Sequence, residues 1–68
     1  MSEQKKLLVL LPHWIEHNAE HAAEFRDWAA RAGPAREGLL QAAAALEEAN
    51  RGLRQALAAL SGQAQEVE

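Results

Sequence analysis

The chain has 68 residues, a net charge of −3 and no cysteine. The absence of cysteine excludes disulfides, thiolate zinc sites and nucleophilic thiols. Charges of both signs are scattered along the sequence, so there is no basic stripe and we expect no nucleic-acid partner. A chain of this length forms a single domain, residues 1–68, that buries only about 60% of its unfolded surface. Further stabilisation is expected from a metal ion or from association with other copies.

An apolar run, Leu7 to Leu11, follows two lysines. A run of this length is compatible with a short strand or with the first turns of a buried helix. Pro12 disfavours helix at the preceding residue and fits a first helical position, which favours residues 5–11 as a strand or extended arm. One long helix from about Ser2, bent at Pro12, is the alternative. The run is too short for a membrane span and no signal cleavage site follows it, so we expect a cytoplasmic protein without a membrane partner.

The first predicted helix covers residues 12–32 and is amphipathic. Its apolar positions are Trp14, Ala22, Phe25, Trp28, Ala29 and Ala32, with Ile15 on the flank. The three aromatic side chains are expected in the core. At 100° per residue, Asn18 and His21 fall inside the same stripe. The middle of this helix is therefore expected to carry a polar layer between two aromatic ones.

Gly33-Pro34 is predicted to end the first helix, because glycine adopts the left-handed cap and proline cannot continue a helix. A second helix is predicted over residues 35–60, with a polar tail at 63–68. Its coiled-coil pattern consists of Leu39, Ala42, Leu46, Ala49, Leu53, Ala56 and Leu60, with Leu40, Ala43 and Leu57 widening the face. The short connection predicts an all-α antiparallel two-helix hairpin that associates, most simply as a dimeric four-helix bundle.

Polar residues on the two predicted helices suggest further contacts. Folding the hairpin brings Asn18 roughly level with Asn50, which predicts a register-fixing polar contact inside or between hairpins. The alternative is that Asn50 is exposed. The charged residues are expected on solvated faces, with Glu47, Arg51 and Arg54 spaced for ion pairs within the second helix.

A tetrad, His-x-x-Glu, is repeated three times between His13 and Glu24. Residues four apart stack along one side of a helix, so the histidines form a row, and each glutamate three positions later can reach its ring. Imidazole is the commonest protein metal ligand. The pattern therefore predicts a transition-metal site whose candidate ligands are His13, His17, His21, Glu20 and Glu24.

The spacing limits how one ion can be held. The outer two histidines lie about 12 Å apart along the helix axis, so only adjacent histidines can share an ion. The remaining ligands would come from a second helix or a second chain across a two-fold axis. Imidazole and carboxylate without sulfur suit nickel, zinc, cobalt, copper or iron, and do not choose among them. Storage, delivery or sensing of the metal is expected, with a homo-oligomer and a metal-handling protein as partners.

Two other classes of function compete with this hypothesis. His-x-x-Glu-His is a zinc-protease motif, but a hairpin of this size lacks the cleft such an enzyme needs. The order His-x-x-Glu and the histidine-free second helix also do not fit a di-iron bundle, so we expect no enzyme. The histidine and glutamate rows could instead form ordinary hydrogen bonds in an oligomerisation or adaptor module without a ligand, with an interface that responds to pH.

Residues 10–32, LLPHWIEHNAEHAAEFRDWAARA, resemble a motif of small uncharacterised prokaryotic helical-hairpin proteins. In that motif His-Trp-Ile-Glu-His-Asn is followed by Glu-His and Phe-x-x-Trp. The matching residues are His13, Trp14, Glu16, His17, Asn18, His21 and Trp28. The resemblance covers the first helix, a third of the chain, and implies transition-metal handling, with nickel or cobalt as the metal. Pro12 departs from the pattern and puts the start of the helix in doubt.

Overall fold

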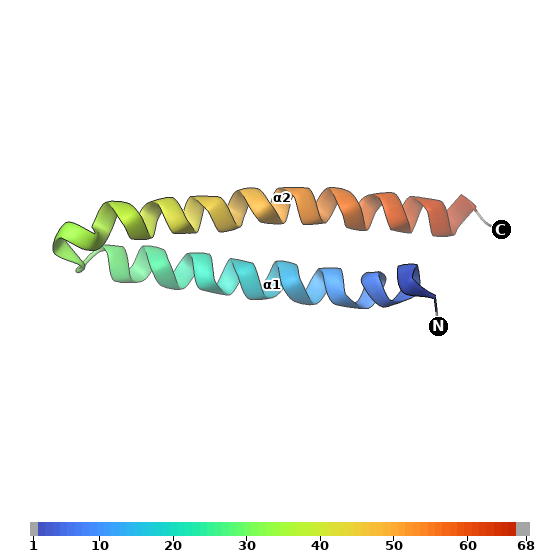
Figure 1. The fold of residues 1–68 in the computed structure, drawn as a ribbon, viewed down its shortest axis with the longest axis horizontal. Helices are drawn as coiled ribbons and strands as arrows, with labels where there is room; N and C mark the ends of the chain where they lie inside the picture. Colours follow the sequence, from blue (N-terminus) through green and yellow to red (C-terminus); the bar gives the residue numbers. More distant parts are fainter. Residues whose placement is uncertain (1, 67–68) are drawn as a thin grey trace.

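Two long helices form an antiparallel hairpin (Figure 1). The computed structural model describes residues 2–66, and the side chains of residues 2–62. α1 covers Glu3–Ala29, the short 3-10 helix η1 covers Gly33–Ala35, and α2 covers Arg36–Glu66. The molecule is a rod of 54 × 17 × 13 Å. The predicted all-α hairpin is confirmed, and neither helix, as far as it is described, is long and apolar enough to cross a membrane.

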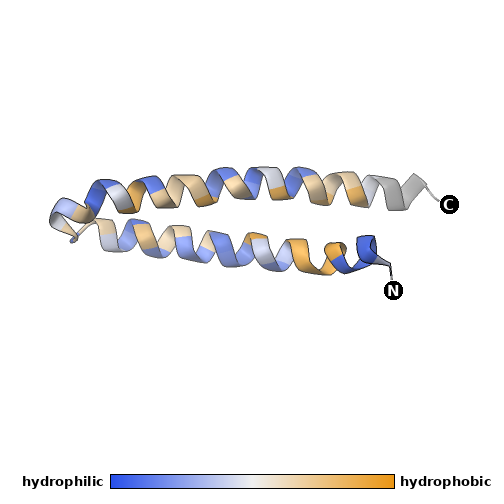
Figure 2. Cartoon of the chain, viewed as in Figure 1, coloured by the Kyte–Doolittle hydropathy of each residue, from blue (hydrophilic) through white to orange (hydrophobic). Residues whose placement is uncertain are grey.

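The apolar segment at residues 5–11 is helical, so the preferred prediction of a strand or extended arm is wrong. α1 begins at Glu3, because the Ser2 hydroxyl caps it by accepting a hydrogen bond from the Lys5 amide at 3.1 Å. The helix then continues through Pro12, which costs about 3 kcal/mol in a helix interior. Packing outweighs this cost, because Leu11 is only 3% exposed and the turn before it is uniformly apolar (Figure 2). The alternative of one long helix is therefore the correct one.

The turn follows the predicted chemistry with a shift of boundaries. α1 ends at Ala29 and not at residue 32, because the last amides bond back over three residues, as in the Arg31 amide to the Trp28 carbonyl at 3.0 Å. Gly33 has a φ of 57°, the left-handed conformation expected of it. α2 then begins at Arg36 and runs past the predicted end at residue 60 as far as Glu66. Residues 63–66 of the predicted tail are helical, and residues 67–68 lie outside the described part.

The core is a narrow stripe along each helix, with alternating spacings of three and four residues. On α1 the inward residues are Leu11, Ile15, Asn18, Ala22, Phe25 and Ala29, and on α2 they are Leu39, Ala43, Leu46, Asn50, Leu53, Leu57 and Leu60. Ala49 and Ala56, which were predicted in the coiled-coil pattern of the second helix, are exposed. Trp14 and Trp28, predicted in the core, are 40% and 54% exposed. The hairpin therefore buries the smaller residues and leaves its two largest side chains outside.

An asparagine pair lies in the middle of this core, as one of the two predicted alternatives requires. The Asn18 side-chain amide donates to the Asn50 Oδ1 atom at 3.1 Å. Asn50, which is 3% exposed, in turn donates to the Ile15 carbonyl at 2.9 Å. Because any shift of one helix along the other would break both bonds, the pair fixes the register of the hairpin.

Candidate metal-binding site

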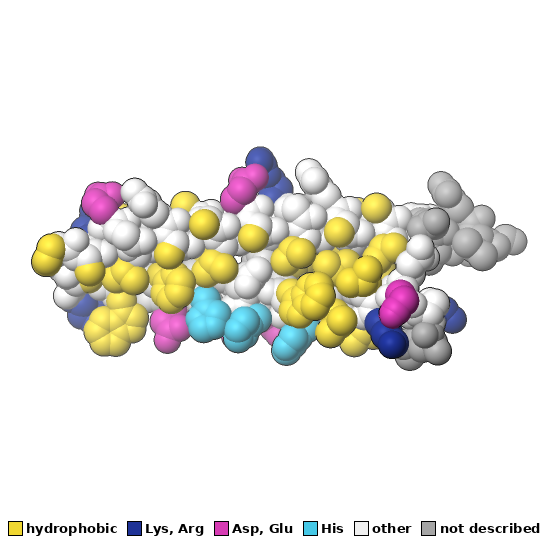
Figure 3. Space-filling model, viewed as in Figure 1, with side chains coloured by type: hydrophobic (Ala, Val, Ile, Leu, Met, Phe, Trp, Pro, Cys, Tyr) yellow, Lys and Arg dark blue, Asp and Glu magenta, His cyan; other side chains and the backbone are white. Residues whose placement is uncertain are grey.

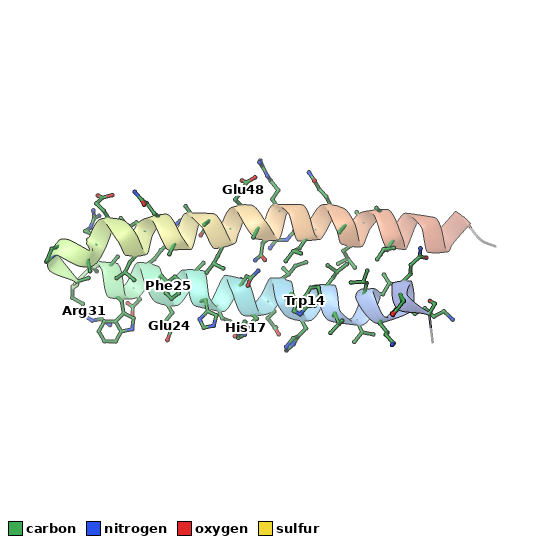
Figure 4. All side chains as sticks on the ribbon, in the orientation of Figure 1. Trp14, His17, Glu24, Phe25, Arg31 and Glu48 are labelled. Atoms are coloured by element: carbon green, nitrogen blue, oxygen red, sulfur yellow. The ribbon has the colours of Figure 1, made fainter. Side chains whose placement is uncertain are left out.

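The three histidines form a row along one edge of α1 (Figure 3). Their spacing of four residues is carried by an unbroken helix, because Ser2 starts α1 well before them and Leu11, at the end of the apolar segment, is buried. Trp14, His17 and Glu24 project from the same side of α1 (Figure 4). This is the side that faces away from the ion pairs on the outer edge of α2, where Glu48 bonds to Arg51.

His17 and His21 direct the same ring nitrogen toward each other. The two Nε2 atoms are 3.0 Å apart, the ring centroids are 4.4 Å apart and the ring planes are perpendicular. If an ion lay about 2.05 Å from both nitrogens, the N–metal–N angle at this separation would be about 94°. Without an ion, one Nε2–H donates a hydrogen bond to the other Nε2 atom. The same geometry therefore serves a chelating pair or a hydrogen-bonded pair.

Glu24 lies beside the other nitrogen of His21. Its Oε1 atom is 3.4 Å from the His21 Nδ1 atom. A carboxylate in this position favours the tautomer with the proton on Nδ1, which leaves the Nε2 lone pair free for a metal. Both side chains are substantially exposed, at 43% for His21 and 59% for Glu24. Glu24 thus lies beside the His21 ring, on the side away from the His17 Nε2 atom.

An apolar groove borders the histidine pair on the side of α2. It has a volume of about 420 Å³ and is lined by His21, Phe25, Ala42, Ala45 and Leu46. The Phe25 ring stacks on His21, with centroids 5.8 Å apart and an interplanar angle of 29°. One side of the pair therefore faces solvent and the other faces a surface without polar groups.

The structure brings together only part of the predicted ligand set. The rings of His13 and His17 are nearly parallel with centroids 6.4 Å apart, and no ring nitrogen of His13 is paired with a nitrogen of His17. Glu20 makes no hydrogen bond or ion pair among the described side chains. Within residues 2–66 no group of three or more potential ligands surrounds a single point. One chain thus offers a two-nitrogen pair, His17 and His21, supported by Glu24.

An ion pair joins the helices on the opposite side of the hairpin. Arg26 donates to Glu47 through Nε at 3.1 Å and through Nη2 at 2.6 Å. The hydrogen bond from Arg26, together with its charge, holds the pKa of Glu47 below the ordinary value, and the same contacts raise the pKa of Arg26. The sequence-based pairing of Glu47 within α2 was wrong, since Arg51 pairs with Glu48. The missed signal is that Arg26 and Glu47 each follow a core residue, Phe25 and Leu46, by one position.

Comparison with known protein families gives one match. The family model described as Domain of unknown function (DUF8180) matches residues 7–60. The chain belongs to this family. The DUF8180 match includes the apolar start of α1, the histidine row, the turn and most of α2, so the histidine pair lies inside the family domain. No curated protein and no solved structure matches the chain.

Proposed function

We propose that this chain binds a divalent transition-metal ion through the Nε2 atoms of His17 and His21, for storage, delivery or sensing of the metal. The observation that carries the proposal is the 3.0 Å separation of these two atoms. Glu24 supports it, because a carboxylate beside Nδ1 fixes the ligating tautomer of His21. The exposure of the pair gives an ion direct access from solvent.

The separation of the two nitrogens can be compared with the geometry of a bound ion. Two nitrogens on a tetrahedral zinc ion would be about 3.3 Å apart, whereas neighbouring positions of a square-planar or octahedral ion are about 2.9 Å apart. The observed 3.0 Å is also an ordinary hydrogen-bond distance, so a small rotation of the rings would suit either arrangement, and nickel, cobalt, copper, iron and zinc are all candidates. His13 lies one turn away and serves as a secondary ligand only if its ring turns toward His17.

Equilibrium dialysis against nickel, cobalt, copper and zinc salts, followed by elemental analysis, tests the proposal. The His17→Ala/His21→Ala variant should lose bound metal. A matched Glu48→Ala/Gln55→Ala variant, with two alanines on the outward face of α2, should keep it. Metal at full stoichiometry in the histidine variant would overturn the proposal.

A second candidate function is an oligomerisation or adaptor module without a ligand. It is favoured by a separate observation, the exposure of Trp14 and Trp28 on the same edge as the histidines. Under this alternative, a chelator leaves mass and melting temperature unchanged, and the histidine variant differs from the parent only in how its association responds to pH.

A further inference from the structure

One stripe of α2 consists only of glycine and alanine. Its members, spaced alternately by four and three residues, are Gly38, Ala42, Ala45, Ala49, Gly52 and Ala56, here called the glycine–alanine stripe. All are exposed except Ala42, which is partly buried. A Cβ atom added at Gly38 or Gly52 would meet nothing within 4 Å, so the hairpin itself does not need glycine at either position. Glycine destabilises a helix interior relative to alanine, so its presence here calls for a close approach from outside the hairpin.

A second stripe, on α1, contains large side chains with the same spacing. Its members are Leu10, Trp14, His17, His21, Glu24 and Trp28, here called the aromatic–histidine stripe. Leu10, Trp14 and Trp28 are 39%, 40% and 54% exposed. Both stripes border the apolar groove, because His21 lines it from α1 while Ala42 and Ala45 line it from α2. They therefore share one face of the rod, on which apolar side chains flank the histidines (Figure 3).

The largest residues of one stripe lie level with the smallest residues of the other. His21 and Ala45 line the same groove from opposite helices, which places them at about the same height along the rod. Moving seven residues from this pair in opposite directions, as antiparallel helices require, places Trp14 level with Gly52. Moving seven residues the other way places Trp28 level with Gly38. Nothing in the hairpin fills the space beside either glycine, so neither tryptophan covers its glycine within one chain.

The exposed surface area of the rod exceeds that of a compact monomer. The chain exposes 5078 Å². A compact monomer of 7.4 kDa exposes about 4200 Å². The excess is close to the roughly 800 Å² that each partner loses in a standard protein interface. Within residues 2–62, no large side chain is fully buried, so one hairpin has a thin core and gains from a partner.

We propose that a second copy of this chain docks on this face, with the aromatic–histidine stripe of each copy lying on the glycine–alanine stripe of the other. A two-fold axis parallel to the rod gives this arrangement, because it keeps every residue at its own height and places α1 opposite the partner's α2. Trp14 of each copy then fills the space over Gly52 of the other, and Trp28 fills the space over Gly38. The interface is self-complementary because large and small residues exchange places across the axis.

The same arrangement places both histidine pairs at the dimer interface. The two pairs formed by His17 and His21 lie at equal height on opposite sides of the axis, so two chains supply four imidazoles to one region. This extension rests on the proposed metal function, whereas the docking of the two copies does not.

The test uses the full chain in the presence of a chelator, so that the outcome is independent of metal binding. Sedimentation and native mass spectrometry should give about 14.8 kDa, twice the mass of the 7.4 kDa chain. Gly38→Leu/Gly52→Leu places a side chain where the partner's tryptophans lie and should shift the mass to that of one chain. Ala44→Leu/Ala58→Leu adds the same side chains at exposed positions of α2 that are not three or four residues from any member of the glycine–alanine stripe, and should leave the mass unchanged.

The change in melting temperature of the leucine variant has opposite signs for an isolated hairpin and for the proposed dimer. In an isolated hairpin both leucines project into open space and replace glycine in a helix, so melting should rise by several degrees. In the proposed dimer the same change removes the interface and melting should fall. Adding Trp14→Ala and Trp28→Ala to the leucine variant makes room again and should restore the doubled mass. A wild-type chain of 7.4 kDa, or a leucine variant that stays dimeric and melts higher, would overturn the proposal.

Discussion

Replacing Asn50 with alanine is expected to lower the free energy of unfolding by about 2–3 kcal/mol. Asn50 accepts a hydrogen bond from Asn18 and donates one to the Ile15 carbonyl, at 3.1 and 2.9 Å. Each neutral hydrogen bond contributes about 1 kcal/mol, and the Asn18 amide would remain partly buried without its partner. For a domain of this size, such a loss lowers the melting temperature by roughly 15–20 °C.

Urea unfolding followed by far-UV circular dichroism measures this change. All variants are compared at one chain concentration, because the stability of an associating protein depends on concentration. Gln55→Ala, at an exposed position on α2, is the control and should stay within about 0.5 kcal/mol of wild type. If Asn50→Ala is as stable as this control, the asparagine pair contributes nothing to the fold and the reasoning is refuted.

The double variant Asn18→Leu/Asn50→Leu separates stability from specificity. It removes both polar groups together, so the free energy of unfolding should be equal to or above that of wild type. Without the polar layer the helices can pair in more than one register, which should appear as additional amide signals in NMR spectra. A single set of signals would show that the leucine and alanine packing alone defines the register.

Three further predictions concern the ion pair, the turn and the start of α1. The hydrogen bond from Arg26 lowers the pKa of Glu47, so this ion pair stabilises the fold above the ordinary carboxyl pKa of 4.5 and stops doing so as pH falls through the lower pKa of the folded state. The melting temperature of wild type should therefore exceed that of Glu47→Gln at neutral pH, and the two should converge in acid. Gly33→Ala forces an alanine to a φ of 57° and should cost about 1 kcal/mol in thermal unfolding, whereas Gly62→Ala in a helix should cost nothing. Pro12→Ala restores a backbone donor inside α1 and should raise the free energy of unfolding by about 2 kcal/mol in urea titrations, while an unchanged value would indicate that the helix does not continue through this position.

The turn and the polar layer could be predicted because each depends on local chemistry. Gly33 is one of few residues that adopt a positive φ without strain, and Pro34 follows it, so the sequence marks this corner directly. The leucine repeat from Leu39 to Leu60 then shows how far α2 extends beside α1. Once the corner is known, counting residues in both directions brings Asn18 to Asn50. These predictions needed no knowledge of tertiary packing.

Other features could not be predicted because two apolar patterns overlap on α1. Both run at alternating spacings of three and four residues, one through Leu11 and Phe25, the other through Trp14 and Trp28. The tryptophans bury more area when covered, so sequence alone favours them as the core. A hairpin with one neighbouring helix can cover only one pattern, and the structure selects the one with small residues. The same packing stabilises the helix before Pro12, where local propensity predicts an interruption.

The candidate site, too, could be predicted only in part from the sequence. The row of His13, His17 and His21 follows from helix periodicity alone. Which two rings converge depends on side-chain rotamers, which the spacing leaves open, and the structure selects His17 and His21. Glu24 was one of two candidate carboxylates, and only it lies near a ring nitrogen.

The position of the chain ends determines how this protein can be linked to other molecules. Both described ends leave the rod at the same side, opposite the turn (Figure 1). His17 is about 22 Å along the axis from Ser2, at 1.5 Å per residue. A fluorophore or surface tether fused near either end therefore stays clear of the imidazoles, and a short peptide joining Glu66 of one copy to Ser2 of another would produce a single-chain tandem without crossing the rod.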